Sequence, residues 1–333
     1  MGKTIKSHAK YFAVLASAAL LAIGCSAPSD DGASAEQDDQ TQSVRVSTDG
    51  TMASAAIHLG VEQGFFDDVG LELEINDSPN PPAAVAALQS NEVDIGAVPT
   101  VPSIAAQSQG IELTSIAPSS GYPEDESVWE EYDEDGIYAQ PDSGISSPAD
   151  LEGKQVAVNA RKAVFEAYVQ DAVIKDGGDP NKIEWVALDF GSQLEALRKG
   201  DIDVATLPMP FTVEAEAEGA ELLWAPGVAF YEGGLNATWL ASPDMAGNTE
   251  VIDKFRTAIL KSNEYANEHR EETIEKASEL TGMSAEAIAD NGKMMYFPAN
   301  LPVEDLEHIS QKLADLGFIE EPVSMTDRVL WTE

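Results

Sequence analysis

Polar side chains that could hold a small molecule gather where predicted strands give way to predicted helices. They are Thr48, Asp49, Thr51, Ser54, Thr100, Ser103, Asn159 and Arg161. In open parallel sheets, the carboxyl ends of the strands and the N-terminal amides of the following helices converge on the crevice where ligands bind. We therefore expect these residues to contact a ligand. Helix N-capping, which needs no ligand, is the alternative role of Ser54 and Ser103.

Arg161 and Lys162 are unusual because they stand at the start of a predicted helix. Cations there oppose the helix dipole, and the chain has only 19 lysines and arginines among 333 residues. Cations that oppose the helix dipole at a predicted crevice are better explained by ligand binding than by a contribution to stability. Arg161 could hold a sulfonate, carboxylate or nitrate through two parallel hydrogen bonds. A solvated surface arginine remains the alternative.

Three aromatic residues near the same crevice suggest an apolar wall, which suits an organic ligand better than bare nitrate. They are Phe165, Phe190 and Phe211, and core packing is the alternative role of Phe165. Asp189, directly before Phe190, and Asn236, after a Gly-Gly pair, complete the expected ligand-binding set.

The motifs of common catalytic and metal sites are missing from the sequence. The histidines after residue 24 are His58, His269 and His308, and no two have metal-ligand spacing. There is no Gly-x-Ser-x-Gly motif and no phosphate-binding loop. Eight carboxylates between Glu124 and Asp135 lack EF-hand spacing, so we expect a solvated loop there. We therefore expect no catalytic residue, no metal and no cofactor.

The elements that position these residues occur twice in the sequence. Residues 83–99 and 192–208 share a pattern in which Leu88, Glu92, Asp94 and Pro99 recur 109 positions later as Leu197, Asp201, Asp203 and Pro208. A strand, a helix and a second strand are predicted before each copy, and a helix and a strand after it. Alternating strands and helices predict parallel sheets with right-handed crossovers. Two such units predict an α/β protein with two similar lobes and a ligand-binding cleft between them.

The distribution of the repeats predicts the domain boundaries. Lobe one is expected to contain residues 44–138 and 238–333, and lobe two residues 139–237. The last part of the chain reads as helical, with an apolar stripe along residues 303–316, and lobe one is its expected packing partner. The two chain crossings, near 137–147 and 232–240, are expected to form a hinge.

The formal net charge is −40, and it becomes −43 when residues 1–24 are set aside. Such a chain repels nucleic acid and anionic lipid headgroups. We interpret the charge as a device for solubility, with adaptation to high salt as one form of it. Cation capture is the alternative, but no spacing of residues supports it strongly.

The N-terminus reads as a secretion signal. Lys3, Lys6 and Lys10 precede an apolar stretch, residues 11–23, that is too short to span a bilayer. Cys25, the only cysteine, follows at once and is the expected lipidation site of a lipoprotein. Residues 25–43 hold five acids and no large apolar residue, so we expect a flexible tether. The folded part is then extracytoplasmic, lipid-anchored to the outer face of the cell membrane.

Several motifs resemble those of type II substrate-binding proteins of ABC importers, in the group that serves nitrate, sulfonates, taurine, bicarbonate and thiamine-pyrimidine precursors. They include Gly64-Phe65-Phe66, residues 91–96, residues 145–154 and residues 200–204, in this order and spacing, together with the lipoprotein signal. The resemblance implies the two-lobed Venus-flytrap fold, in which a ligand favours closure of the lobes.

The same resemblance implies a small-molecule ligand, an ABC permease with its ATPase as partners, and a monomer. It points to a small anion of the sulfonate, taurine or nitrate class. A thiamine-pyrimidine or flavin-like heterocycle is the alternative ligand, and a ligand-sensing lipoprotein is the alternative function. One relative of this fold makes the thiamine pyrimidine itself with a cysteine-rich iron motif, which this chain lacks.

Overall fold

Residues 41–77, 81–291 and 293–330 are described by the structure, a computed structural model. The predicted signal, Cys25 and most of the predicted tether lie outside the described residues. The first strand starts at Gln42, two residues before the predicted start of lobe one at residue 44.

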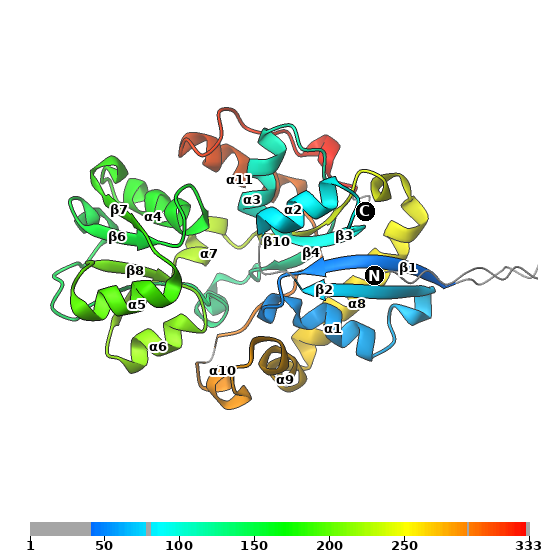
Figure 1. The fold of residues 1–333 in the computed structure, drawn as a ribbon, viewed down its shortest axis with the longest axis horizontal. Helices are drawn as coiled ribbons and strands as arrows, with labels where there is room; N and C mark the ends of the chain where they lie inside the picture. Colours follow the sequence, from blue (N-terminus) through cyan, green and yellow to red (C-terminus); the bar gives the residue numbers. More distant parts are fainter. Residues whose placement is uncertain (1–40, 78–80, 292, 331–333) are drawn as a thin grey trace, which may run out of the picture. The chain divides into compact units, whose positions relative to one another are not determined.

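Two five-stranded sheets form the centres of two lobes (Figure 1). The first sheet has the order β2-β1-β3-β10-β4, and its strands are β1 (Gln42–Thr48), β2 (Leu71–Asp77), β3 (Ile95–Pro99), β4 (Thr114–Gly121) and β10 (Leu235–Ala241). The second has the order β7-β6-β8-β5-β9, and its strands are β5 (Gly136–Ala139), β6 (Gln155–Val158), β7 (Glu184–Ala187), β8 (Val204–Leu207) and β9 (Glu221–Trp224). We call the two sheets with their helices lobe one and lobe two.

The sheets are mixed, whereas the sequence predicted parallel ones. Strand β10 is antiparallel to β3 and β4, and β5 is antiparallel to β8 and β9. The reason is that both strands arrive from the other lobe, so no crossover within the same sheet sets their direction. The chain changes sheet between Gly121 and Gly136 and again between Trp224 and Leu235. The predicted lobe limits at 138 and 238 stay a prediction.

Helices cover both faces of each sheet, because alternate strand residues point to opposite faces. In lobe two, Val156 packs toward α4 (Val164–Lys175) and Ala157 toward α5 (Phe190–Lys199) and α6 (Phe211–Ala217). In lobe one, α1 (Ala55–Glu62) and α8 (Thr249–Glu268) cover one face, and α2 (Pro81–Gln89) and α3 (Thr100–Ser108) cover the other.

The sequence repeat has a structural cause. Asp94 Oδ2 accepts a hydrogen bond of 2.8 Å from the Arg45 amide, and Asp203 Oδ2 accepts one of 2.8 Å from the Gln155 amide. In return, the Asp94 and Asp203 amides donate to the carbonyls of Arg45 and Gln155. Asp94 thus joins the turn before β3 to β1, and Asp203 joins the turn before β8 to β6.

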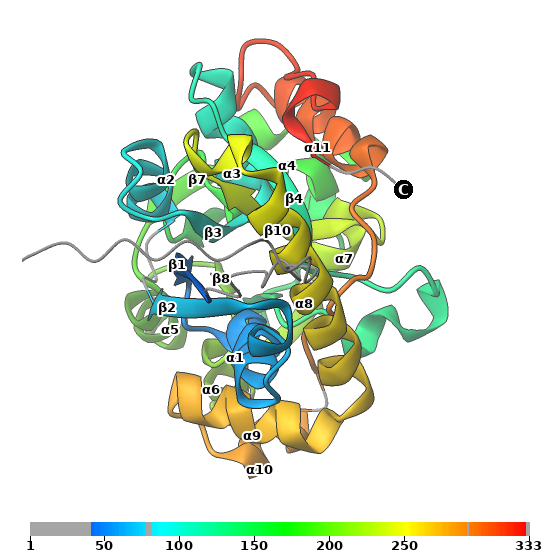
Figure 2. The ribbon, with the colours of Figure 1, turned by 90° about the vertical axis from the view of Figure 1, so that its right-hand side faces the viewer.

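The C-terminal helices pack on lobe one, as the sequence predicted. Helix α8 lies along α1, and α9 (Arg270–Thr281) also contacts α1 (Figure 2). Helix α10 (Ala285–Asn291) contacts α9, and α11 (Val303–Asp315) contacts α3. Asn248 caps α8 by accepting a hydrogen bond from the Val251 amide.

One apolar core crosses from lobe to lobe. It combines residues of α3 and α11 in lobe one with Phe165 and Tyr168 of α4 in lobe two, and with Phe230 and Tyr231 of α7 (Pro226–Tyr231), which lies in the second crossing. Burial of such apolar area favours this arrangement of the two lobes.

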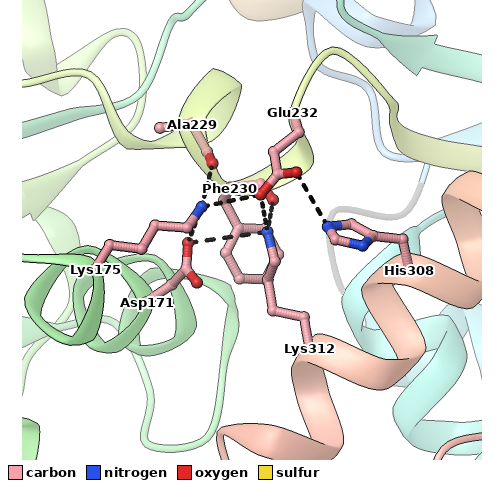
Figure 3. A network of polar contacts seen from close by, with 7 residues as sticks. All are labelled: Asp171, Lys175, Ala229, Phe230, Glu232, His308 and Lys312. Atoms are coloured by element: carbon pink, nitrogen blue, oxygen red, sulfur yellow. Dashed lines mark hydrogen bonds and ion pairs between the residues drawn. The ribbon is translucent and has the colours of Figure 1, made fainter.

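Ion pairs beside this core link the same elements (Figure 3). Glu232 Oε1 lies 3.0 Å from Lys175 Nζ of α4 and 3.0 Å from Lys312 Nζ of α11. Asp171 Oδ2 lies 3.0 Å from Lys175 Nζ, and His308 Nε2 lies 3.3 Å from Glu232 Oε2. We call Asp171, Lys175, Glu232, His308 and Lys312 the hinge network.

Candidate functional site

A cavity of about 610 Å³ lies between lobe one and the loop that precedes α4. Lobe one supplies mostly apolar side chains from α2, α3 and their flanks: Pro82, Val85, Ala86, Gln89, Pro99, Val101, Pro102, Ala105, Ala106 and Ile111. Lobe two supplies residues 159–164, with Asn159, Arg161 and Lys162 as the polar members. The cavity therefore combines an apolar wall with a basic, hydrogen-bonding edge, the usual make-up of a small-molecule site.

Arg161 lies at this edge and is half-exposed. Its Nε donates to Glu166 Oε2 at 2.8 Å and its Nη2 donates to Glu166 Oε1 at 3.0 Å. The guanidinium carbon lies 5.4 Å from the centre of the Trp185 ring. One edge of the planar guanidinium is thus engaged by the protein, and the N–H groups of Nη1 make no hydrogen bond that the described residues show.

Lys162 takes the left-handed backbone conformation, with φ of 58°. This conformation is uncommon for a residue with a side chain. The Lys162 amide donates to Glu166 Oε2 at 2.5 Å, and its Nζ donates to the Gly317 carbonyl at 2.9 Å. The ammonium also lies 4.9 Å from the centre of the Phe318 ring. Lys162 therefore links the loop before α4 to the segment that follows α11.

Of the residues expected to bind the ligand, the cavity brings together Asn159 and Arg161. The group after β1 makes hydrogen bonds within its own loop. Asp49 Oδ1 accepts from Thr51 Oγ1 and from Ser54 Oγ, each at 2.8 Å, and Thr48 Oγ1 bonds Asp77 Oδ1. Ser54 stands at the N-cap of α1 but makes no capping bond, so it organises the loop rather than the helix.

The two residues on α3 also bond internally. Buried Thr100 Oγ1 donates to the Leu235 carbonyl at 2.9 Å, and buried Ser103 Oγ accepts from Gln107 Nε2 at 3.1 Å. Ser103 is the fourth residue of α3, so its alternative role as N-cap is wrong. Thr100 ties α3 to the start of β10, and neither side chain lines the cavity.

The three aromatic residues expected at the crevice form a row of rings. The Phe190 ring centre lies 5.7 Å from that of Phe165 and 5.5 Å from that of Phe211. Phe165 is buried in the core shared by the lobes, in line with the packing alternative, whereas Phe211 is partly exposed. None of the three lines the cavity.

Asp189 and Asn236 have local structural partners. Asp189 caps α5, because its Oδ1 accepts from the Ser192 amide at 2.9 Å. Asn236 Oδ1 accepts from Ser120 Oγ at 2.6 Å, which links β10 to β4. Their expected contact with a ligand stays a prediction.

The acidic segment before β5 is partly buried, so the predicted solvated loop is wrong at its end. Asp133 is 1% exposed. Burial raises its pKa to about 6, although a hydrogen bond from the Val228 amide opposes the rise. Burial raises the pKa of Glu134 to about 8, and the negative charges of Asp49 and Asp133 add to the rise. The sequence signal for this burial was the position of these acids directly before a crossing strand.

The described part of the chain holds no cluster of side chains suited to a metal ion. Within residues 41–77, 81–291 and 293–330, no group of three His, Cys, Asp or Glu side chains is arranged to hold a metal ion. The charged side chains that line the cavity are those of Arg161 and Lys162, and both are cationic. The geometry of this edge suits hydrogen bonding to a polar or anionic group.

A family model described as NMT1/THI5 like matches residues 52–273, which include most of both lobes and the whole cavity edge. The chain belongs to the NMT1/THI5-like family. Among curated protein sequences, none matches this member.

Solved structures share the fold of this NMT1/THI5-like protein. The periplasmic aliphatic sulphonate binding protein SsuA from Escherichia coli superposes with a TM-score of 0.72 at 17% identity, covering 88% of this chain and 93% of that one. The alkanesulfonate-binding protein SsuA from Xanthomonas axonopodis pv. citri, bound to MOPS, has a TM-score of 0.67 at 16% identity, covering 88% and 99%. These likenesses identify a two-lobed periplasmic binding protein fold.

A third solved structure widens the comparison. A point mutant of DszB in complex with biphenyl-2-sulfinic acid has a TM-score of 0.61 at 17% identity, covering 87% of this chain and 96% of that one. The fold alone therefore does not define the ligand of this family member. None of its helices within the described residues is both long and apolar enough to cross a bilayer.

Proposed function

We propose that this protein is the extracytoplasmic solute-binding component of an ABC importer and that it captures a small organic anion. The observation that carries the proposal is the cavity of about 610 Å³ that combines Asn159 and Arg161 with the apolar wall of α2 and α3. Arg161 would bind the anionic group, and the wall would bind an apolar body. An alkyl or aryl sulfonate fits this pairing better than nitrate, which has no apolar part.

The position of the cavity supports a closing mechanism. Its wall belongs to lobe one and its polar edge to lobe two, so a ligand that touches both favours the closed arrangement of the lobes. The closed form would then deliver the ligand to the permease, and the importer's ATPase would drive transport. Catalysis is not part of the proposal, because the sequence has none of the common catalytic motifs.

A heterocyclic ligand is the second candidate. The row of rings formed by Phe165, Phe190 and Phe211 favours it, because flat heterocycles stack on aromatic side chains. In this case Phe211, which is partly exposed, would contact the ligand, and Arg161 would contribute little.

Membrane attachment rests on the sequence. Cys25 follows a secretion-type signal, and we propose that it carries lipid chains that anchor the protein to the outer face of the membrane. Label from a fatty acid should enter the wild-type protein and should be absent from the Cys25→Ala variant. Unlabelled wild-type protein would refute the anchor without affecting the ligand proposal.

Thermal unfolding in the presence of candidate ligands tests the function. The panel contains alkyl and aryl sulfonates, taurine, nitrate, bicarbonate, pyrimidines and flavins. A ligand at one hundred times its Kd adds about 2.7 kcal/mol to the free energy of unfolding, which raises the melting temperature by several degrees. Sulfonates should produce this shift, and Arg161→Ala should lower their affinity at least tenfold.

Arg198→Ala is the matched control, because Arg198 is a similarly exposed arginine that pairs with Glu195 on α5. It should leave the affinity unchanged. A shift with heterocycles alone would replace the anion by the second candidate. Delivery is tested separately, because cells that lack this protein should lose uptake of the same compound. Retained uptake together with binding to a receptor domain would favour a ligand sensor.

A further inference from the structure

Glu166 is a buried carboxylate directly behind the polar edge of the cavity. Glu166 is 0% exposed. Its two carboxylate oxygens accept hydrogen bonds from Arg161 Nε, Arg161 Nη2, the Lys162 amide and Gln170 Nε2. Burial alone would raise the pKa of Glu166, but the hydrogen bonds and charge of Arg161 and the Lys162 amide hold it below its usual value. Glu166 is therefore ionised at neutral pH and is fully engaged with this edge.

The loop conformation depends on this carboxylate. Lys162 has a positive φ, and such a conformation costs on the order of 1 kcal/mol or more unless its surroundings fix it. Glu166 Oε2 accepts the Lys162 amide hydrogen, and Gln170, one helical turn further along α4, holds the other oxygen. Helix α4 thus presents Glu166 as an anchor for the residues that line the cavity.

The charge of the cavity edge also depends on it. Arg161 and Lys162 are the charged residues that line the cavity. Lys162 directs its ammonium to the Gly317 carbonyl and the Phe318 ring, and Arg161 shares its charge with Glu166. A ligand anion at Arg161 would therefore meet the field of the guanidinium and the opposing field of the carboxylate behind it. At this range, one opposing unit charge weakens the binding of the anion by about as much free energy as one hydrogen bond contributes.

We propose that Glu166 is the positioning residue of the ligand site and that it sets the preference of the site for charged over uncharged ligands. This inference rests on the proposed function, because it assigns the role to the same cavity. Glu166 holds Arg161 and the loop in place, and it partly cancels the charge that Arg161 offers. The site then binds organic anions with moderate affinity and also tolerates uncharged polar head groups.

Two compounds with the same body provide the test. Naphthalene-2-sulfonate is anionic and naphthalene-2-sulfonamide is uncharged at neutral pH, and both would place their rings against the wall of α2 and α3. The affinities of both are measured by calorimetry on the full-length wild-type protein and on Glu166→Gln. The amide keeps the shape of Glu166 but removes its charge, so the ratio of sulfonate to sulfonamide affinity should rise about tenfold.

Three further variants separate the effect of the Glu166 charge from its effect on the structure of the loop before α4. Glu195→Gln changes the charge of lobe two equally, at an exposed carboxylate that pairs with Arg198 and Lys199, and should leave the ratio unchanged. The double variant Arg161→Met with Glu166→Gln should give a ratio close to that of Arg161→Met alone, because the anion is held close to the carboxylate only when Arg161 binds it. Glu166→Asp keeps the charge and should keep the wild-type ratio, even if its melting temperature falls.

The outcomes distinguish the two levels of the proposal. If the wild type binds the sulfonate but Glu166→Gln leaves the ratio within about twofold, or lowers it, the charge-setting role of Glu166 is refuted and the proposed function stands. If neither compound binds the folded wild type, the organic-anion site itself fails, and the role of Glu166 fails with it. A rise in the ratio that also occurs in Glu195→Gln would be a general charge effect and would likewise refute the role.

Discussion

Residue-scale chemistry in this protein is governed by how the few cations are used. Arg161 forms an ion pair with Glu166, and Lys175 and Lys312 both form ion pairs with Glu232. Carboxylates far outnumber bases, so the carboxylates that lack a cation must stay in water or bind protons when buried. The segment before β5 contains buried carboxylates whose pKa values are raised, Asp133 and Glu134.

Glu134 should make the protein less stable as the pH rises. Its folded pKa is about 8, against a usual value of 4.5. A carboxyl with a raised pKa binds its proton more tightly in the folded state, so stability falls between pH 4.5 and 8 as the unfolded chain releases the proton first. We expect Glu134→Gln to melt several degrees above the wild type at pH 8 and to match it near pH 4.5. A difference that does not depend on pH would contradict the burial of this group.

The residue-level predictions from the sequence were limited by what a sequence can encode. Type and spacing marked Asn159 and Arg161, which line the cavity. They could not show that Thr100 bonds the Leu235 carbonyl, 135 residues away in the chain. They also missed Glu166, because a glutamate inside a predicted helix is indistinguishable from a solvated one until its burial is known.

At the scale of elements, the repeated aspartates predict the same backbone-anchoring role in both lobes, and Asp94 adds two hydrogen bonds from the Arg45 side chain. Asp94 accepts a hydrogen bond from the Arg45 amide of β1, and Asp203 accepts one from the Gln155 amide of β6, each at 2.8 Å. Alanine at either position should lower the free energy of unfolding by about 1–2 kcal/mol, because a charged acceptor is lost. Chemical denaturation measures both values, and the double variant should show their sum, since the two joints lie in different sheets. If the loss at Asp94 exceeds that at Asp203 by much more than the roughly 1 kcal/mol of an exposed ion pair, or falls below it, the two copies share a sequence pattern but not a structural role.

In the hinge network, the ionisation of Glu232 depends on Lys175 and Lys312. Burial opposes the ionisation of Glu232, but hydrogen bonds and charge from Lys175 and Lys312 lower its pKa to about 2. A lowered pKa stabilises the folded state above the unfolded value of about 4.5, and this contribution is lost as the pH falls toward 2. Glu232→Gln should therefore melt below the wild type at pH 7.

This difference should shrink steadily below about pH 4.5, because the wild-type carboxylate then takes up a proton. Glu195→Gln is the control, since Glu195 also has two cationic partners but lies on α5, away from the crossing. If both variants lose the same stability, the hinge network contributes no more than a surface ion pair.

The elements themselves were the most predictable part of the structure. The apolar stripe along residues 303–316 predicted helix α11 close to its observed bounds. The direction of β5 and β10 was not predictable from local patterns, because direction depends on which sheet a strand enters. Parallel and antiparallel strands of this length have the same alternation of side chains.

The whole molecule carries a net charge of −40, and repulsion among its carboxylates opposes folding. With 59 acidic and 19 basic residues, most carboxylates have no cation of their own. Added salt shortens the screening length from about 10 Å at 0.1 M to about 3 Å at 1 M. It weakens the repulsion between many carboxylates more than it weakens the few close ion pairs. We therefore expect the melting temperature to rise when KCl is increased from about 0.1 to about 1 M.

Other solutes and a variant with fewer carboxylates show whether screening of charge causes the rise in melting temperature. NaCl should act like KCl, because screening depends on ionic strength and not on which monovalent cation is present. Sucrose, which favours burial without screening charge, should raise the melting temperature of the wild type and of a variant with fewer carboxylates equally. Salt should help that variant less. A melting temperature that falls with salt would instead mean that ion pairs such as those of Glu232 dominate, and the excess of acids would then have to be explained by something other than tolerance of salt.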